Sequence, residues 1–212
     1  MKEILDGVML GDASLQIDKK NRCINGRFSQ CCKHVDYLDF IRNAFASKEL
    51  TFCPSYVLRR DKRWDSQTYT LRSRAHPYWT DECNRWYKEE QKRVPRDIEI
   101  TPIVLLHWFL CDGSLGYAWE ELVRVTLSSQ SFPHEDVEYL RDKLSQIGIF
   151  TWNDKGRIQV QKTSIPRFFE YIPVSPVWSF HYKWVFCRPE YDFWKELSNS
   201  FQKLSFPSAT KV

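Results

Sequence analysis

The 212-residue sequence predicts an α+β fold made of two similar αββαββ halves related by a pseudo-twofold axis. Three observations lead to this prediction. Short motifs recur about one hundred positions apart. Two stretches are apolar on nearly every side, which is typical of buried helices. Several other segments alternate polar and apolar residues with a period of two, as antiparallel strands do.

The overall composition places the chain among globular proteins. Hydrophobic residues make up 42% and charged residues 27%, the balance of a folded domain. No apolar run approaches the about 20 residues that a membrane span needs, so we expect no membrane partner. Asp6 and Asp12 interrupt the apolar core that a secretion signal requires, which predicts an intracellular protein of a bacterial or phage cytoplasm or of an organelle. Seven cysteines with no C-x-x-C pair argue against a disulfide framework and a structural zinc site.

The internal repeat gives the order of elements. The segment DASL at 12–15 recurs as DGSL at 112–115, and VDYL at 35–38 recurs as VEYL at 137–140. Gln30 recurs as Gln130. Each half therefore contains an apolar helix, an acid, a strand pair, a polar helix, a second strand pair and a helix.

Periodicity and capping signals place the individual elements. Pro102 suits the first turn of a helix that Thr101 caps. We expect helices at 3–11, 34–47, 76–89, 102–111, 134–147 and 164–172, and strands within 68–74, 122–128 and 156–161. The tail after Pro189 is expected to form an amphipathic helix. It could close the core of the second half or brace the edge of a bound partner, and the first alternative is favoured.

Charge is segregated along the chain. Residues 155–169 carry basic side chains and no acid, and residues 56–74 have six basic residues against two acids, whereas 119–142 has six acids against two basic residues. A chain sorted in this way can present one basic face to a polyanion; the alternative is scattered surface charge. The polar positions of the expected strands are Arg, Gln and Thr, which contact phosphates and base edges. A merely solvated sheet face would show the same alternation.

Two acids follow the two apolar helices. Gly7 and Gly11 form a flat stripe along which these helices can pack, and packing would bring Asp12 and Asp112 together at their C-terminal ends. Two carboxylates at negative helix ends repel each other, and a divalent cation such as Mg²⁺ would relieve this repulsion. The alternative is that each Asp only begins a turn; its repetition favours the metal site.

With these paired motifs, the sequence resembles the LAGLIDADG homing endonucleases in their single-chain, two-repeat, intron-encoded form. LDGVMLGDA at 5–13 and LLHWFLCDG at 105–113 match the paired motifs. The resemblance extends over about 4–186. Linked matches are KRVP at 92–95, SQSF at 129–132, VEYL at 137–140 and YK at 182–183. His107 occupies a motif glycine position and is interpreted as a core residue.

The resemblance implies two αββαββ repeats with antiparallel, saddle-shaped DNA-binding sheets around paired motif helices. It divides the chain into an N-terminal repeat at 1–98, a C-terminal repeat at 99–188 and a tail at 189–212. The implied activity is Mg²⁺-dependent cleavage of both strands of DNA at a long, specific site. Carried over by position, Asp12 and Asp112 would bind metal and take part in catalysis, Lys92 and Lys183 would lie near the scissile phosphates, and Gln30 and Gln130 would order water.

The expected partners and cofactors follow from this hypothesis. Double-stranded DNA is the expected substrate of a monomer, Mn²⁺ is expected to replace Mg²⁺, and Ca²⁺ is expected to bind without supporting cleavage. Phosphodiester hydrolysis by metal, acid and lysine is chemically consistent, although each lysine could also be a surface cation. The expected DNA contacts are Arg27, Thr70, Arg72, Arg74, Arg124, Arg157 and Gln159.

Two other functions compete with the endonuclease. The same fold could serve an RNA-splicing maturase acting on intron RNA, or a DNA-binding regulator that no longer cleaves. Retention of both acids and both lysines favours an enzyme, but maturase activity can coexist with intact acids. A third alternative is an aromatic-rich α+β protein with no nucleic-acid role, which the repeat and the basic segments disfavour.

Overall fold

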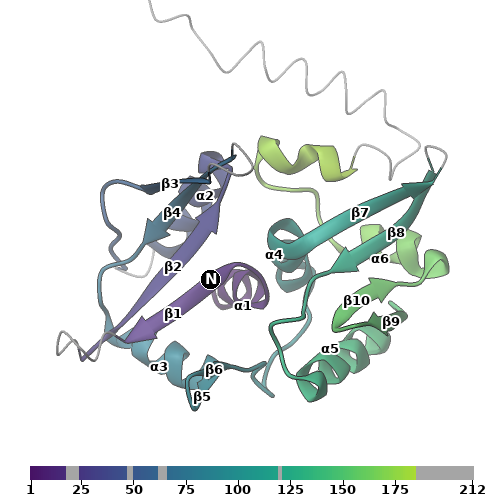
Figure 1. Ribbon diagram of the computed structural model, residues 1–212, viewed down its shortest axis with the longest axis horizontal. Coiled ribbons are helices and arrows are strands. Elements are labelled where there is room, and N and C mark those ends of the chain that lie inside the picture. Colours follow the sequence, from purple (N-terminus) through teal and green to yellow (C-terminus); the bar gives the residue numbers. More distant parts are fainter. Residues whose placement is uncertain (18–23, 47–49, 62–65, 119–120, 185–212) are drawn as a thin grey trace, which may run out of the picture.

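The computed structural model describes residues 1–17, 24–46, 50–61, 66–118 and 121–184. It contains two halves arranged around a central pair of helices, α1 and α4 (Figure 1). The first half consists of α1 (Lys2–Leu10), β1 (Ala13–Ile17), β2 (Gly26–Cys32), α2 (Val35–Ala46), β3 (Val57–Asp61), β4 (Ser66–Arg72) and α3 (Pro77–Trp86). The second half consists of α4 (Pro102–Asp112), β7 (Gly113–Ala118), β8 (Glu121–Leu127), α5 (His134–Gln146), β9 (Thr151–Asp154), β10 (Arg157–Val160) and α6 (Ile165–Tyr171).

Both halves have the same sheet topology. The first sheet has the order β1-β2-β4-β3 and the second the order β7-β8-β10-β9, and neighbouring strands are antiparallel. The α+β class and the repeated αββαββ order are therefore confirmed. The short elements η2 (Lys162–Ser164) and η3 (Trp178–Trp184) were not predicted, and the predicted tail helix lies outside the described residues.

Five of the six predicted helices begin and end within one residue of the observed ones. The third, expected at 76–89, ends at Trp86 because the chain turns into a hairpin of β5 (Tyr87–Lys88) and β6 (Gln91–Lys92). Glu89 and Glu90 form its turn with φ of 50° and 66°. Turns with positive φ at both central residues favour Asn, Asp and Gly over Glu, so this turn could not be predicted from the residue types.

The core follows the predicted faces. Helix α4 begins at Pro102 with the Thr101 hydroxyl accepting from the Val104 N–H at 3.3 Å, and its residues 104–110 are buried. In the second sheet the alternating residues on β8 and β10 face the core, and in the first sheet Phe28 and Leu71 do. The buried members of the second sheet are Val125, Leu127, Ile158 and Val160.

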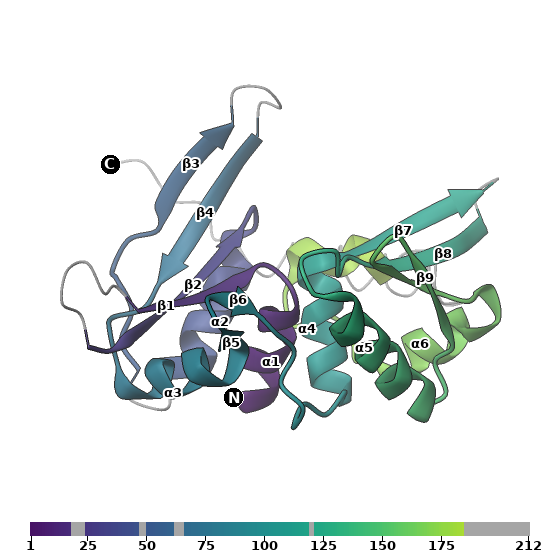
Figure 2. The ribbon, with the colours of Figure 1, turned by 60° about the horizontal axis from the view of Figure 1, so that its bottom comes forward.

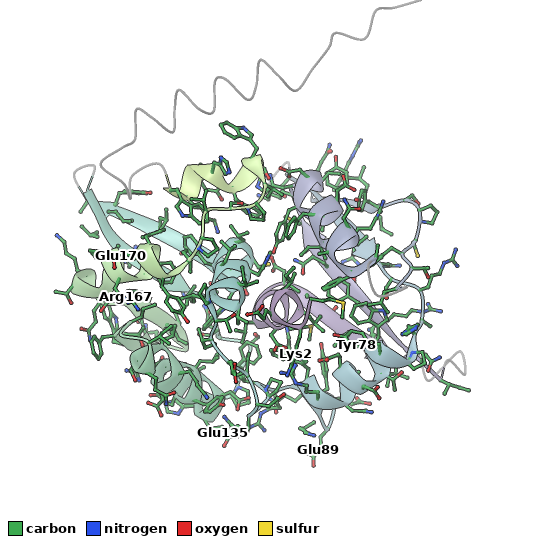
Figure 3. The ribbon with its side chains drawn as sticks, turned by 180° about the vertical axis from the view of Figure 1, so that it is seen from behind. Lys2, Tyr78, Glu89, Glu135, Arg167 and Glu170 are labelled. Carbon is green, nitrogen blue, oxygen red and sulfur yellow. The ribbon has the colours of Figure 1, made fainter. Side chains whose placement is uncertain are left out.

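The two sheets and the helices lie on different sides of the molecule. Figure 2 shows both sheets splayed apart above α1 and α4, with α3 and α5 below them. The helical side, seen in Figure 3, carries labelled side chains of both signs, and ion pairs there join Lys2 to Asp97 and Arg167 to Glu170. Within the described ranges, no helix is long and apolar enough to cross a membrane.

Candidate active site

Helices α1 and α4 approach each other closely because α1 has two glycines at the contact. A Cβ atom placed on Gly7 would lie 2.6 Å from both the Cβ of His107 and the carbonyl oxygen of Val104. A Cβ atom on Gly11 would lie 2.4 Å from the Cβ of Cys111. Non-bonded carbon atoms do not approach to these distances, so the contact requires the absence of a side chain at both positions. The predicted packing along Gly7 and Gly11 is confirmed.

The packing of α1 against α4 brings the two acids, Asp12 and Asp112, to the same end of the helix pair. Asp12 comes immediately after Gly11, the C-cap of α1, and Asp112 is the last residue of α4. Figure 2 shows the ends of the two helices, from which β1 and β7 depart, beside each other between the sheets. Unpaired carbonyl groups make a helix C-terminus negative, so both carboxylates lie in a region that attracts cations.

The first lysine binds the chain around Asp12. Lys92 is the last residue of β6, and its Nζ donates hydrogen bonds to the carbonyl oxygens of Gly11 at 3.1 Å and Ala13 at 2.8 Å. These two carbonyls flank Asp12, so the ammonium group is held next to the acid. The hairpin of β5 and β6 places Lys92 there.

The second lysine occupies the corresponding place at the end of α4. Lys183 belongs to η3 and is 5% exposed. Its Nζ donates to the carbonyl oxygens of Phe109 at 2.7 Å, Leu110 at 3.0 Å and Gly113 at 2.8 Å. The chain thus brings one acid and one lysine from each half to a single place, as the sequence predicted from residues far apart.

Burial and mutual repulsion change the ionisation of the acids. Burial and the neighbouring charge of Asp12 raise the pKa of Asp112 to about 7, against the opposite effect of Lys92 and Lys183. Burial likewise raises the pKa of Asp12, and the same two lysines lower it. Each raised pKa means that the negative form lacks sufficient compensation from the protein alone.

The lysines are affected in the opposite sense. Burial lowers the pKa of Lys92 to about 8 despite the nearby carboxylates of Asp112 and Asp12. Burial also lowers the pKa of Lys183 to about 8, with Cys111 and Asp112 acting in the other direction. At neutral pH each lysine remains mostly protonated, so both place positive charge beside the two acids.

The two predicted glutamines occupy different environments. Gln30 lies on β2 opposite Ala13, is 1% exposed, and donates from Nε2 to the Cys31 carbonyl oxygen at 3.2 Å. Its Oε1 is buried without a hydrogen-bond partner in the structure. Gln130 is exposed in the turn after β8. Because Leu127, not Gln130, pairs with Gly113, the two glutamines do not occupy equivalent positions.

The outer face of the second sheet carries all three DNA contacts that were predicted in the second half. Arg124, Arg157 and Gln159 line one polar pocket together with Gln130. Gln159 is 7% exposed and donates to Asp154 at 2.7 Å, so its amide is already engaged. Five further residues line this pocket and were not among the predicted DNA contacts: Ser114, Leu115, Thr126, Ser128 and Asp154. For Thr126 and Ser128, which flank the buried Leu127, alternation with buried neighbours was the signal that could have identified them.

The outer face of the first sheet carries the remaining predicted contacts. Arg72 pairs with Ser29 across β2 and β4, which places it on the same face as Arg27. Both arginines and Arg74 are exposed. Thr70 is only 5% exposed, so it offers little surface for a ligand.

A family model described as the LAGLIDADG DNA endonuclease family matches residues 2–168. The chain belongs to this family. Curated relatives of this LAGLIDADG chain include an uncharacterized protein of Methanocaldococcus jannaschii, 29% identical over 152 residues that make up 68% of the chain and 55% of the relative. The cytochrome b mRNA maturase bI2 of Debaryomyces hansenii is 28% identical over 120 residues, 53% of the chain and 45% of the maturase. The chain spans about half the length of these relatives.

Solved structures share the LAGLIDADG fold. The homing endonuclease I-WcaI, bound to its DNA recognition sequence, matches with a TM-score of 0.73 and 20% identity, covering 87% of this chain and 85% of that one. Mesophilic variants of the homing endonuclease I-DmoI match with a TM-score of 0.50 and 14% identity, covering 92% of this chain and 96% of that one. At these identities the likeness establishes the fold.

One LAGLIDADG motif lacks the glycines of the other. His107 and Cys111 stand one hundred positions after Gly7 and Gly11 and face them across the helix contact. The Nδ1 of His107 lies 2.8 Å from the Tyr37 hydroxyl, and burial lowers the pKa of His107 to about 3. His107 is thus a neutral, hydrogen-bonded core residue, in agreement with its interpretation from the sequence.

The donor set suits the metal that the LAGLIDADG family implies. Asp12 and Asp112 offer carboxylate oxygens. Within the described part of the chain, no cluster of three or more His, Cys, Asp and Glu residues could hold a metal, so the protein would supply these two ligands. Mg²⁺ commonly binds through one or two carboxylates and completes its shell with water and phosphate oxygens. Burial and, after it, repulsion from Asp12 raise the pKa of Asp112, and a cation here would offset this repulsion.

Proposed function

We propose that this protein is a site-specific endonuclease that hydrolyses both strands of double-stranded DNA at a long recognition site with Mg²⁺. One observation carries the proposal: an acid and a lysine from each half meet at the paired helix ends, between two sheets whose outer faces bear arginines. Family membership and the fold shared with the DNA-bound I-WcaI support it.

In this proposal each residue has a defined task. Asp12 and Asp112 would hold the cation, which when bound activates water and stabilises the leaving oxygen. Lys92 and Lys183 would each lie near one scissile phosphate and offset the negative charge that develops in its transition state. The arginines of the two sheets would hold the duplex across the acids, and the chain would act as a monomer.

Cleavage of a randomised-site DNA library tests the proposal. We expect discrete double-strand cuts in Mg²⁺ and Mn²⁺, and binding without cuts in Ca²⁺. Asp12→Asn and Asp112→Asn should each abolish cutting and preserve DNA binding, because they remove charge without changing side-chain size. Asp142→Asn, an exposed acid on α5, is the matched control. Unchanged cleavage in either active-site variant would overturn the assignment of the metal site.

The relationship to the maturase bI2 supports a second candidate function, binding of intron RNA. If the purified chain binds DNA in both Mg²⁺ and Ca²⁺ but never cuts it, the endonuclease proposal fails. Structured intron RNA is then the next ligand to test, with a scrambled RNA of the same length as the control.

A further inference from the structure

An aspartate in the first turn of α5 holds the segment that follows Lys92. Asp136 is fully buried, and its Oδ2 accepts hydrogen bonds from the Nε of Arg93 at 2.8 Å and the backbone N–H of Val94 at 3.0 Å. Its Oδ1 accepts from the guanidinium of Arg96 at 2.8 Å. The two residues directly after Lys92 are therefore fastened to a helix of the second half.

An aspartate in the first turn of α2 holds the segment that carries Lys183. The Oδ1 of Asp36 accepts from the Ser179 hydroxyl at 2.6 Å, and its Oδ2 accepts from the Ser179 N–H at 3.2 Å. The next residue, Phe180, packs edge-on against Tyr37 of the same helix, with ring centroids 5.2 Å apart. Segment η3, yellow-green in Figure 1, is thus attached to a helix of the first half.

The two contacts cross between the halves. Lys92 reaches the end of α1 in the first half, but its segment is anchored to α5 in the second. Lys183 reaches the end of α4 in the second half, but its segment is anchored to α2 in the first. We propose that Asp136 and Asp36 are positioning residues that fix the places of Lys92 and Lys183, respectively. Each lysine then contacts the end of a helix in one half, while its position is fixed by an aspartate of the other half.

The physical basis is the length of the lysine side chain. Four rotatable bonds separate Nζ from the backbone, so an ammonium group has a defined place only if its backbone is fixed as well. A displacement of about 1 Å in a reacting group can cost on the order of 100-fold in rate. The crossed contacts fix the backbone on one side of each lysine, and the helix-end carbonyls fix its amine.

The proposal is tested first without DNA, on the folded full-length chain. Acylation of each lysine amine by acetic anhydride is followed by mass spectrometry in wild type, Asp136→Asn and Asp36→Asn. We expect several-fold faster modification of Lys92 in Asp136→Asn with Lys183 unchanged, and the reverse in Asp36→Asn. Asp39→Asn and Glu138→Gln are matched controls, because their partners Tyr56 and Arg141 lie within their own halves; neither should alter either lysine.

The second readout rests on the proposed function, in which each lysine serves one scissile phosphate. On a cleavable site, Asp136→Asn and Asp36→Asn should each slow a different strand by about tenfold, so that nicked DNA accumulates with opposite strand bias. Ser179→Ala should reproduce the strand bias of Asp36→Asn. If Asp136→Asn does not fold, Arg96→Gln removes one bond to the same carboxylate and should give the same bias more weakly.

The outcomes separate the two proposals. If wild type cuts no DNA, the endonuclease proposal fails while the acylation rates still decide the positioning proposal. Unchanged reactivity of Lys92 in folded Asp136→Asn, or an equal change of both lysines in either variant, would overturn the positioning role.

Discussion

Lys183 of the second half is buried and donates to three carbonyl oxygens, whereas Lys92 of the first half is partly exposed and donates to two. The helices they serve differ as well, because α1 has glycines at the contact and α4 has His107 and Cys111. The two halves therefore contribute the same charged groups to the site, one acid and one lysine each, but the residues packed around these groups differ. Close approach of two helices requires small residues on one partner only, which leaves α4 able to carry a histidine that hydrogen-bonds to Tyr37.

Replacement of the two lysines should have the largest effect. Lys92→Met and Lys183→Met should each slow cleavage of one strand by about 100-fold to 1,000-fold, the range found when one transition-state donor is removed. Nicked intermediates and strand-specific labels measure this. Lys183→Met should also unfold at lower urea than Lys92→Met, because three carbonyls lose a buried donor. Equal slowing of both strands by either variant would contradict the division of labour.

Asp136 and Asp36 should differ in their effects on stability. Asp136→Asn should lower the free energy of unfolding by about 2 kcal/mol, since it disrupts several charge-assisted hydrogen bonds in a buried place. Asp36→Asn should cost less than about 1 kcal/mol because Asp36 is exposed. Urea unfolding of both variants measures the difference; equal losses would show that burial does not distinguish the two anchors.

The same contacts predict a pH dependence. Burial alone would raise the pKa of Asp136, but hydrogen bonds from Arg93 and the Val94 N–H, together with the charges of Arg93 and Arg96, lower it below the usual 3.8. The stabilisation is therefore complete above that value and is lost as the pH falls through the lower, folded-state pKa. Wild type should lose stability below about pH 4 more steeply than Asp136→Asn, as measured by urea midpoints across that range.

The contact between Gly11 of α1 and Cys111 of α4 can be tested by moving the glycine from one helix to the other. Gly11→Ala should lower the free energy of unfolding by about 2 kcal/mol, because the new methyl group overlaps the Cβ of Cys111. Adding Cys111→Gly should recover part of this loss, whereas adding Cys111→Ala, which keeps the Cβ, should not. A double-mutant cycle by urea denaturation gives the coupling energy, and zero coupling in both pairs would show that the helices simply move apart.

Substitutions in two hairpin turns should have the smallest effects on the free energy of unfolding. The turn before Lys92 has Glu89 and Glu90 at positive φ, whereas the turn between β9 and β10 has Lys155 and Gly156 at 54° and 84°. Glu90→Gly should stabilise the protein by up to about 1 kcal/mol by removing backbone strain. Glu90→Ala is the control, since it shortens the side chain and keeps the Cβ, and it should give no gain in thermal unfolding. Gly156→Ala should destabilise by a similar amount.

The local elements and the pair of acids could be predicted because their signals are local. Apolar residues on every side of 4–10 and 103–110 indicate buried helices wherever they occur, and alternation within 122–128 indicates a strand with one core face. The glycine stripe at Gly7 and Gly11 indicates close packing by the absence of a Cβ alone. These features, with the repeated Asp, were sufficient to indicate which residues meet.

By itself, then, the sequence determined the αββαββ repeat and the helix pair, and it predicted which acids and lysines form the site. The tertiary structure decided how they are held. Strand register made Gln30 and Gln130 non-equivalent, the Glu89–Glu90 turn set the place of Lys92, and crossed contacts tied each lysine segment to the opposite half. The reason is that periodicity and capping report on neighbours along the chain. Register and long-range hydrogen bonds are chosen only when distant segments compete for the same partners.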